Sequence, residues 1–473
     1  MECWHLWRLP CTQSLWYNLI TMNKSLLYIV VVAALGGFLF GFDSGVISGC
    51  EQAIGKEFAL SGFWLGFLVS VALIGTVIGV FGAGSPSDKW GRRPTLFLMG
   101  GMFLVSALGC ALTPAGAMGP YFLGVMRFIG GLAIGGVSVV VPLYIVEVSP
   151  GHLRGRLVAM NQLNIVFGIL ISYVSNYFVA KYVGPHADPN FIWRMMLGVM
   201  AIPTVAFLAL LCTIPESPRW LVRAGKKELA SGILGKIGYE NPMATVAEIE
   251  SSLAEVASAG TSVSLFQKRY MKPIMLAFLI AFFNQVSGIN AINYYSPRIF
   301  SMIFGEGSQL ASLAGTIGVG CVNLTFTVLA LFIIDKFGRK VMIIGGASLM
   351  IIMHAIVAWQ LSLPTPNAAI AVGGILGFIA FFACSSGAVI WVYISEVFPN
   401  VVRAKGQALG CFTHWFMCTL ISWFFPVVAE KAGTYAFGFF AFMMVLQLIW
   451  AIFFMPETKG GTIEDIEKRL GIK

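Results

Sequence analysis

Apolar residues along this chain run in long blocks that are separated by short polar connections. A helix needs about 20 apolar residues to cross the hydrocarbon core of a bilayer, and blocks of that length occur twelve times. The predicted spans are approximately 26–48, 62–84, 94–113, 119–142, 157–180, 191–213, 273–300, 309–333, 341–362, 367–395, 405–427 and 433–454. The pattern therefore predicts an all-α integral membrane protein.

The longest polar connection, 215–272, separates the first six spans from the last six. Within it, residues 225–237 and 244–257 carry apolar side chains at helical spacing, which predicts short amphipathic helices beneath the membrane domain. We expect an N-terminal six-helix bundle, a cytoplasmic helical linker, a C-terminal six-helix bundle and a cytoplasmic tail. Their expected bounds are 22–214, 215–272, 273–457 and 458–473.

Residues 1–21 differ from the rest of the chain. They contain Trp4, Trp7 and Trp16 but no long apolar run, and they lack the layout of a signal peptide. They form either an interfacial segment or a stretch that is absent from the mature protein. We favour the second interpretation, in which Met22 is the true start.

Three short motifs occur twice, at offsets of 247, 249 and 241 positions. The pairs are 88–93 with 335–340, 144–150 with 393–399, and 215–217 with 456–458. Matched motifs at nearly one offset indicate two pseudo-symmetric halves in tandem. Such a pair of bundles offers a site at its interface, which opens to either side by rocking.

Lysine and arginine lie almost wholly in the connections. If the N-terminus is cytoplasmic, 24 of the 30 basic residues lie on the cytoplasmic side, five lie on the opposite side, and Arg127 lies inside a span. The five are Lys56, Lys181, Arg194, Arg298 and Lys431. Basic residues favour the cytoplasmic side, so both termini are expected there. The net charge of +9 then reflects orientation and not a nucleic-acid partner.

Composition supports lipid as the solvent of this chain. Only 11% of its residues are charged and 58% are hydrophobic, whereas a soluble domain carries about 25% charged residues. The nine cysteines are scattered without a CxxC pair, which indicates neither a disulfide framework nor a metal site. The five histidines show no paired spacing and no catalytic set is visible. We therefore expect no enzymatic activity, cofactor or metal.

Asp43 in the first span and Arg127 in the fourth are charges that the pattern places inside the membrane. An ionised carboxylate there costs at least about 2.5–3.5 kcal/mol unless it is paired. Pairing with Arg127 favours the ionised form, and loss of that partner favours the protonated form. Asp43 could thus take up a proton on one side and release it on the other. The alternative is a purely structural pair in a facilitator.

The repeated loop motifs place acidic residues beside arginines at the ends of spans. Ion pairs between them would act as latches that hold the inward side closed and break as it opens. The alternative is that the arginines only set the topology. The residues predicted to form this cytoplasmic gate are Asp88, Arg92, Arg93, Glu147, Arg154, Glu216, Arg219, Asp335, Arg339, Lys340, Glu396 and Arg403.

Several short segments together resemble the sugar porter family of the major facilitator superfamily, over about residues 26–460. They are 36–43, 91–93, 154–157 with Gln162, 215–220, Gln285 with 288–290, and 456–460. Each is weakly specific, but their order makes the set highly specific. The pattern is most similar to the bacterial sugar–proton symporters of the xylose and hexose type. The resemblance implies the major facilitator fold and proton-coupled import of a monosaccharide, such as glucose, galactose, xylose or arabinose.

A monosaccharide is an uncharged disc of hydroxyl groups, so its site needs amides that donate and accept hydrogen bonds, together with aromatic faces. Amides inside spans should face the protein interior, because unpaired amides in lipid are costly. Each could instead join helices. The resemblance assigns sugar contacts to Phe40, Gln162, Gln285, Asn290, Tyr294, Asn323, Gly387, Trp391 and Trp415.

Two positions depart from the family pattern. Asn284 precedes Gln285 where a second glutamine is common, and His414 precedes Trp415 where an amide is common. Both changes would reshape the hydroxyl contacts, so the sequence does not name the sugar. His414 is either a ligand contact or a hydrogen-bonded interior histidine.

The resemblance also assigns the proton to Asp43 and leaves a facilitative uniporter as the alternative. A non-transporting sugar sensor is disfavoured because the tail after the last span is short. The outer connections are short and carry no accessible glycosylation sequon. We therefore expect a multi-pass protein of a bacterial inner membrane that functions as a monomer, with a monosaccharide, a proton and the bilayer as its partners.

Overall fold

The computed structural model describes residues 23–258, 264–305, 307–399, 401–431, 433–460 and 463–470. Over these residues all the regular structure is helical, and twelve helices are long and apolar enough to cross a membrane. Each predicted span overlaps one of them with ends that differ by six residues or fewer. The prediction of twelve spans is confirmed. Residues 1–21, for which two interpretations were left open, lie outside the described residues.

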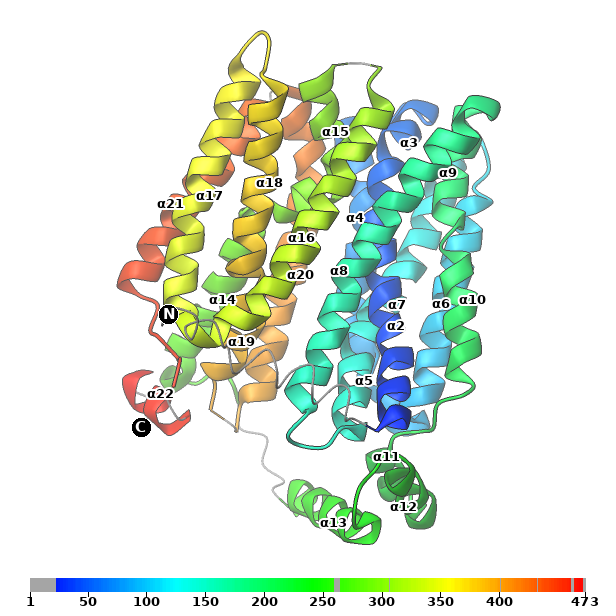
Figure 1. The fold of residues 1–473 in the computed structure, drawn as a ribbon, viewed down its shortest axis with the longest axis vertical. Helices are drawn as coiled ribbons and strands as arrows, with labels where there is room; N and C mark the ends of the chain where they lie inside the picture. Colours follow the sequence, from blue (N-terminus) through cyan, green and yellow to red (C-terminus); the bar gives the residue numbers. More distant parts are fainter. Residues whose placement is uncertain are drawn as a thin grey trace, which may run out of the picture.

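The helices form two halves that stand side by side (Figure 1). The first half contains α2 (Lys24–Val46), η1 (Ile47–Gly49), α3 (Glu51–Glu57), α4 (Gly62–Gly82), α5 (Gly84–Trp90), α6 (Arg92–Ala111), α7 (Gly119–Val148), α8 (Arg154–Phe178), η2 (Val179–Val183), η3 (Gly184–His186), α9 (Pro189–Gly198) and α10 (Ala201–Leu211). The second half contains η4 (Lys268–Tyr270), α14 (Met271–Val286), α15 (Ile289–Phe304), α16 (Gln309–Phe337), α17 (Arg339–Ser362), α18 (Ala368–Cys384), α19 (Ser386–Glu396), α20 (Arg403–Lys431) and α21 (Gly433–Phe453).

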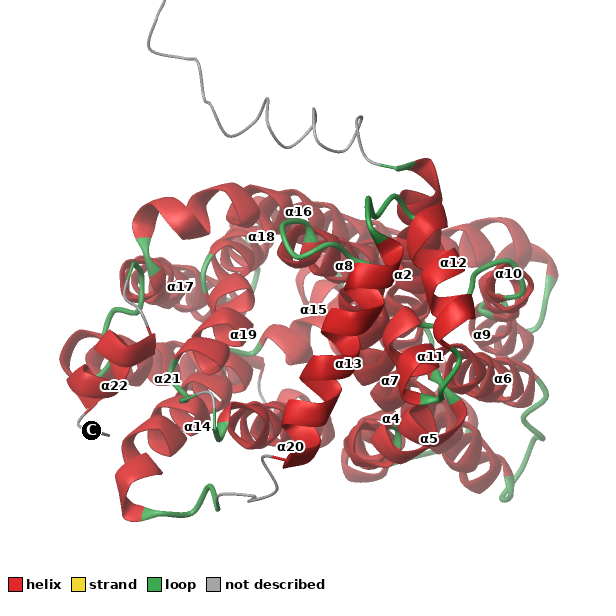
Figure 2. Ribbon diagram, turned by 90° about the horizontal axis from the view of Figure 1, so that it is seen from below, coloured by secondary structure: helices red, strands yellow, loops and turns green. Residues whose placement is uncertain are grey.

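Three short helices occupy the connection between the halves, at one end of the bundle (Figures 1 and 2). They are α11 (Pro218–Arg223), α12 (Lys227–Lys236) and α13 (Pro242–Ser258). The two predicted amphipathic helices correspond to α12 and α13, and α11 was not predicted. We call this end of the molecule the linker end and the other the distal end. The last helix, α22 (Ile463–Leu470), also lies at the linker end.

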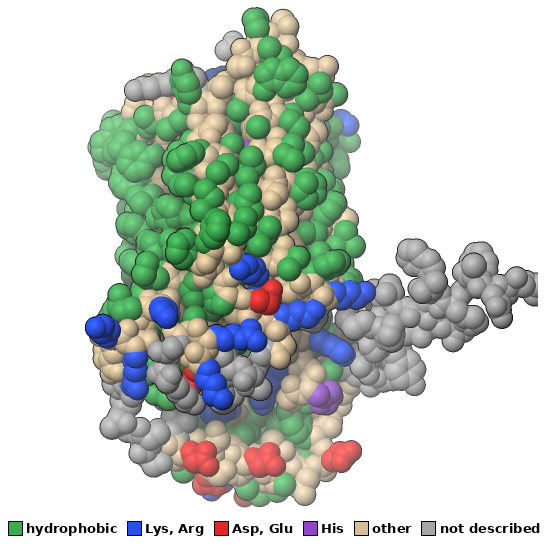
Figure 3. Space-filling view, turned by 90° about the vertical axis from the view of Figure 1, so that its left-hand side faces the viewer, with side chains coloured by type: hydrophobic (Ala, Val, Ile, Leu, Met, Phe, Trp, Pro, Cys, Tyr) green, Lys and Arg blue, Asp and Glu red, His purple; other side chains and the backbone are tan. Residues whose placement is uncertain are grey.

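The surface has the polarity of a membrane protein. Hydrophobic side chains cover most of the face that Figure 3 shows, and Lys and Arg gather in a band toward the linker end. Most of the acidic side chains in this view lie beyond the band, at the tip of the linker end, and one lies within it. Lipid therefore fits against the apolar belt, and the basic band fits the level of the headgroups.

The two halves touch each other through a few helix pairs, chiefly α4 with α20 and α8 with α16. Within the first half, α4 and α7 cross closely because their interface contains glycine. A Cβ atom on Gly131 would collide with the carbonyl oxygen of Ala72, and one on Gly135 with that of Thr76. Gly101, in α6, has nothing within 4 Å of the equivalent position.

The seventh span is broken, although the apolar pattern predicted one run over 273–300. Helix α14 ends at Val286 and α15 begins at Ile289. Gly288 between them has a left-handed conformation with φ of 88°, and a Cβ atom there would collide with the ring of Phe440. The break frees the carbonyl of Ser287, which His354 Nε2 contacts at 2.9 Å. The tenth span is also broken, at Ser385 between α18 and α19, where φ is −122° and ψ is −94°.

The contrast between Gly131 and Gly101 leads to a stability prediction. Gly131→Ala should destabilise the protein by about 1–3 kcal/mol because the added methyl group overpacks the α4–α7 crossing. Gly101→Ala, which meets open space, should leave the stability unchanged or raise it slightly. Thermal unfolding of both variants in detergent tests this. Equal melting temperatures for the two variants would contradict the close crossing.

Candidate functional site

A cluster of amides surrounds the break in the seventh span. Asn290 Nδ2 donates to Gln285 Oε1 at 2.6 Å, and Gln285 Nε2 donates to Asn284 Oδ1 at 3.0 Å. The same Nε2 lies 3.0 Å from His414 Nδ1, on α20. Gln285 therefore stands at the centre of the cluster. Its neighbours from α14, α15 and α20 satisfy its hydrogen bonds in the absence of a ligand.

Aromatic rings flank this amide cluster. The ring of His414 lies 4.9 Å from that of Trp391 and 5.2 Å from that of Trp415. Phe40, on α2 of the first half, contacts Trp415 of the second half with ring centroids 5.6 Å apart. The cluster thus combines amides with apolar faces and lies where the two halves meet.

Four other residues that were predicted to contact the sugar lie outside the amide cluster. Gln162 is exposed on α8. Asn323 is buried in α16, where Thr327 Oγ1 lies 3.5 Å from its Oδ1. No hydrogen bond or ring contact within the described residues joins Gln162 or Asn323 to the amide cluster. Gly387 lies in the first turn of α19, directly after the break in the tenth span. Tyr294 is buried in α15 and faces the first half.

Asn284, the departure from the family pattern, has a structural role here. Its Nδ2 donates to the carbonyl of Ser386 at 3.0 Å, at the start of α19. Gln447 Nε2 lies 3.2 Å from the hydroxyl of the same serine. Asn284 therefore joins the break of the seventh span to the break of the tenth, and its Oδ1 orients Gln285.

Asp43 and Arg127 form a buried ion pair. Arg127 Nη1 lies 2.8 Å from Asp43 Oδ1, and the two residues are only 1–2% exposed. The other carboxylate oxygen and Arg127 Nε have no partner among the described residues. The phenol of Tyr294 lies beside the hydroxyl of Ser44 and within electrostatic reach of both charges. The pair is thus incompletely satisfied, and a helix of the second half approaches it.

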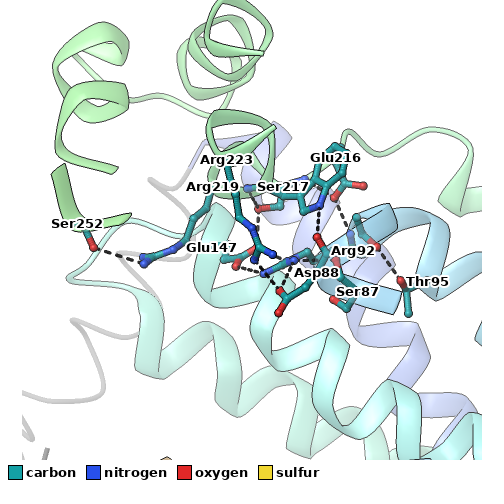
Figure 4. A network of polar contacts seen from close by, with 12 residues as sticks. Ser87, Asp88, Arg92, Thr95, Glu147, Glu216, Ser217, Arg219, Arg223 and Ser252 are labelled. Atoms are coloured by element: carbon teal, nitrogen blue, oxygen red, sulfur yellow. Dashed lines mark hydrogen bonds and ion pairs between the residues drawn. The ribbon is translucent and has the colours of Figure 1, made fainter. Parts of the chain in front are cut away.

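At the linker end, Arg92 is held by two acids (Figure 4). It makes a forked contact with Glu147, with both N–O distances at 2.9 Å, and a further contact with Asp88 at 3.1 Å. It also donates to the carbonyl of Ser87 at 2.7 Å. Arg223 of α11 reaches Asp88 at 3.1 Å. This network joins the ends of α5, α6 and α7 to the linker.

Glu216 caps the start of α6. It accepts hydrogen bonds from the backbone N–H groups of Arg92 and Arg93, at 3.0 and 3.2 Å. The Arg93 side chain donates to two carbonyls at the end of the sixth span. Arg219 lies 3.4 Å from the hydroxyl of Ser252 in α13. The Glu216 contacts bind the start of the linker to the first half, and the Arg219–Ser252 contact joins α11 to α13 within the linker.

The second half repeats the arrangement. Arg339 Nη2 contacts Glu396 at 2.8 Å, and Glu457 accepts from the backbone N–H groups of Arg339 and Lys340 at 2.9 and 3.0 Å. The Lys340 ammonium donates to a carbonyl near the end of α21. The duplicated sequence motifs therefore fold into duplicated ion-pair clusters. The Arg92–Glu147 and Arg339–Glu396 pairs each lie within one half.

Two further gate candidates bind backbone, not acids. Arg154 Nε donates to the carbonyl of Ser149 at 3.2 Å, and Arg403 Nε to that of Phe398 at 3.4 Å. Each arginine closes the turn that follows its repeated motif, 144–150 or 393–399, in the same way. The side chain of Asp335 lies outside what the structure describes.

Besides Arg223, three members of these clusters were not predicted. Ser217 donates to Glu147, and Thr458 donates to Glu396, both at 2.5 Å. Glu457 is the counterpart of Glu216 but was not proposed as a gate residue. The signal for all three was present in the sequence, because each lies in a motif that occurs in both halves.

The pKa values of the two capping acids are shifted in opposite directions. Burial raises the pKa of Glu216 above its ordinary value of 4.5, against the opposing effect of the N–H groups of Ser217, Arg92 and Arg93. Burial also acts on Glu457, but the N–H groups of Lys459, Arg339, Lys340 and Thr458 outweigh it and lower the pKa of that carboxyl. The pseudo-symmetric positions are thus not electrostatically equivalent.

These opposite directions predict opposite pH dependences. Glu457 stabilises the fold above pH 4.5, and this contribution is lost as the pH falls through its lowered folded pKa. Glu216 binds its proton more tightly in the folded state, so stability decreases as the pH rises from 4.5 through its raised folded pKa.

The measurement is thermal unfolding of the purified protein across pH 3.5–7. Glu457→Gln should flatten the profile below its ordinary pKa of 4.5, and Glu216→Gln should flatten it above the same value. Variants that alter the same side of the profile would contradict the assignment.

Known proteins are similar to this chain over nearly its whole length. The family described as "Sugar (and other) transporter" matches residues 29–470. The D-xylose-proton symporter of Escherichia coli (strain K12) is 37% identical over 483 residues, covering 94% of this chain and 96% of that protein. The arabinose-proton symporter of Bacillus subtilis (strain 168) is 36% identical, covering 95% and 96%.

Solved structures agree with these relatives. The inward-open conformation of the xylose transporter XylE from E. coli matches with a TM-score of 0.83 at 35% identity, covering 94% of this chain and 99% of that one. The same transporter bound to 6-bromo-6-deoxy-D-glucose matches with a TM-score of 0.73, at 35% identity and covering 95% and 100%.

Proposed function

Because the chain belongs to the sugar transporter family, we propose that it imports a monosaccharide together with a proton, by alternating access and without chemical change to the sugar. The observation that carries this proposal is the amide and aromatic cluster at the broken seventh span, which Tyr294 connects to the buried Asp43–Arg127 pair. A sugar site and a proton site then share one helix, α15. Relatives named as D-xylose- and arabinose-proton symporters support both substrates.

The sugar would bind against Gln285. Its amide is held in place by Asn284 and Asn290, so a sugar hydroxyl that displaces His414 from Nε2 would meet a donor that is already ordered. Trp391 and Trp415 offer ring faces to the C–H surface of a pyranose. Phe40 comes from the first half, so closure of the two halves would complete the pocket. Gln162, Asn323 and Gly387 are proposed to join the site when the halves approach.

Asp43 would carry the proton. Its ion pair with Arg127 is buried, and separation of the two groups would leave a lone carboxylate in a dry interior, where the protonated form is favoured. Because Tyr294 approaches the pair from the second half, rocking of the halves would change its environment. A potential of ~100 mV supplies ~2.3 kcal/mol per proton, which at ~1.4 kcal/mol per decade allows roughly fifty-fold accumulation.

We place the linker end in the cytoplasm, together with both termini, because the basic residues gather there. The membrane would be a bacterial inner membrane, as its bacterial relatives suggest, and the functional unit a monomer. The proposed domain bounds are 22–214, 215–272, 273–457 and 458–473. Resemblance to the inward-open transporter with a TM-score of 0.83 supports an inward-facing state for this structure.

The two linker-end clusters are proposed to form the cytoplasmic gate. Their duplication in both halves supports a shared mechanical role. Arg92 with Glu147, and Arg339 with Glu396, each pair within one half. They would therefore act by tying the span ends of a half together, so that the half moves as one body. Because both pairs are formed in the inward-facing state inferred above, they would stay intact when that end opens and would not break as latches.

Facilitated diffusion is the second candidate, because a paired and buried Asp43 is also what a structural ion pair would look like. Asp43→Asn separates the two. Under symport, sugar counterflow in proteoliposomes survives in this variant, whereas accumulation driven by an imposed proton gradient falls from roughly fifty-fold to about one. Wild-type protein without a gradient is the control. Equal accumulation by the variant and the wild type would leave facilitation as the function.

The sugar site has its own prediction. Gln285→Ala removes hydrogen bonds worth about 1–3 kcal/mol, so the apparent Kd in counterflow with a panel of labelled pentoses and hexoses should rise roughly 5- to 150-fold. Gln360→Leu is the matched control, since Gln360 is a buried amide of α17 whose oxygen accepts from the N–H of Asn367, away from the cluster. It should lower stability but leave the apparent Kd unchanged. A reversed pattern would exclude Gln285 from the site.

A further inference from the structure

A buried ion pair joins the two halves at the distal end. Glu51, the first residue of α3, accepts from two nitrogens of Arg298 on α15, with Nε at 3.1 Å and Nη2 at 2.8 Å. Glu51 is 0% exposed. Figure 1 shows α3 and α15 close together at the end opposite the linker. The forked geometry is the strongest arrangement that arginine and a carboxylate can make.

This pair differs from the others in what it connects. Arg92–Glu147, Arg127–Asp43 and Arg194–Glu57 each lie within the first half, and Arg339–Glu396 lies within the second. Glu51–Arg298 bridges the first half and the second. Rocking of the halves must therefore change this pair, whereas it can leave the others intact.

Neighbouring contacts act in the same direction. The hydroxyl of Tyr173, on α8, donates to the carbonyl of Asn293 on α15 at 2.9 Å, and this bond also crosses between the halves. Helix α15 is kinked at Tyr295, where φ is −126° and ψ is 19°; this residue is buried and lies within electrostatic reach of Glu51. The turn η1 packs against α15 as well. Helix α15 is thus fastened to the first half along the distal end.

We propose that Glu51 and Arg298 form the latch of the distal entrance, which is the outer entrance in the orientation argued above. With the pair intact, α15 stays against α3 and that entrance is closed. Opening separates the two groups and hydrates both, and sugar then reaches the amide cluster from outside. This inference rests on the proposed transport function for its meaning. The test of the latch itself reads conformation and requires no sugar.

If the pair is a latch, a variant that removes one of its two charges should shift the protein toward the outward-open state. In Glu51→Gln, amide hydrogen exchange should rise at least threefold in residues 289–304 and 47–57, and should fall at the linker-end helix termini. Arg298→Gln should give the same change. The doubly reversed variant Glu51→Arg with Arg298→Glu restores opposite charges and should return exchange toward that of the wild type. The protein is measured in lipid nanodiscs without substrate.

Glu57→Gln is the matched control. Glu57 binds Arg194 at 2.6 Å at the same end of the molecule, but that pair lies inside the first half. This variant should lower the melting temperature without the opposed change at the two ends. If Glu51→Gln behaves like Glu57→Gln, or if the reversed pair stays as open as the single variants, the latch is wrong.

Two further measurements keep the outcome clear. If Glu51→Gln does not fold, Arg298→Lys replaces it, because lysine keeps the charge but cannot make the forked contact. This variant should give a smaller shift in hydrogen exchange in the same direction. The absence of any shift would overturn the proposal. Sugar counterflow by the same samples separates the two ideas. An exchange shift without counterflow of any sugar would contradict the proposed function and retain the latch. Counterflow without an exchange shift would do the reverse.

Discussion

A helix that breaks inside a bilayer must find partners for the backbone groups that the break releases. That constraint organises the second half of this protein. The break at Ser287 and Gly288 brings His354 to a free carbonyl, and Asn284 reaches Ser386 at the break of the tenth span. Polar side chains gather at these two points because lipid cannot satisfy them. The amide cluster around Gln285 is the part of this polar region that contacts aromatic rings of the half interface.

Charges follow the same rule at greater cost. Asp43 and Arg127 pair inside the first half, and Glu51 and Arg298 pair across the two halves. Both pairs lie near α15, which also carries Asn290 and Tyr294. One helix of the second half therefore contacts the amide cluster, the buried carboxylate and the distal entrance. Movement of that helix is a physical route by which sugar binding, protonation and closure can influence one another.

The linker end is built differently. There the same motif occurs in both halves. In each half, an arginine at the start of one span forms an ion pair with a glutamate at the end of the next span. A second glutamate caps the helix start in each half. Symmetry holds for the contacts but not for the electrostatics, since Glu216 is more deeply buried and Glu457 is better supplied with N–H donors. The linker helices pack on the first half, which makes the two ends unequal.

Hydrophobic run length alone determined the number of spans, because lipid imposes one length on every helix that crosses it. The repeat determined the two halves, and residue type singled out Asp43, Arg127 and Gln285 as costly groups to bury. Tertiary structure decided which groups meet. Arg298 counted in the sequence only as one of a few outward charges, yet it binds Glu51, 247 positions away. Asn284 was read as a departure in a sugar contact, yet it joins two helix breaks. Such pairings depend on helix rotation and on where a span breaks, and hydropathy does not record either, since it averages over all sides of a helix.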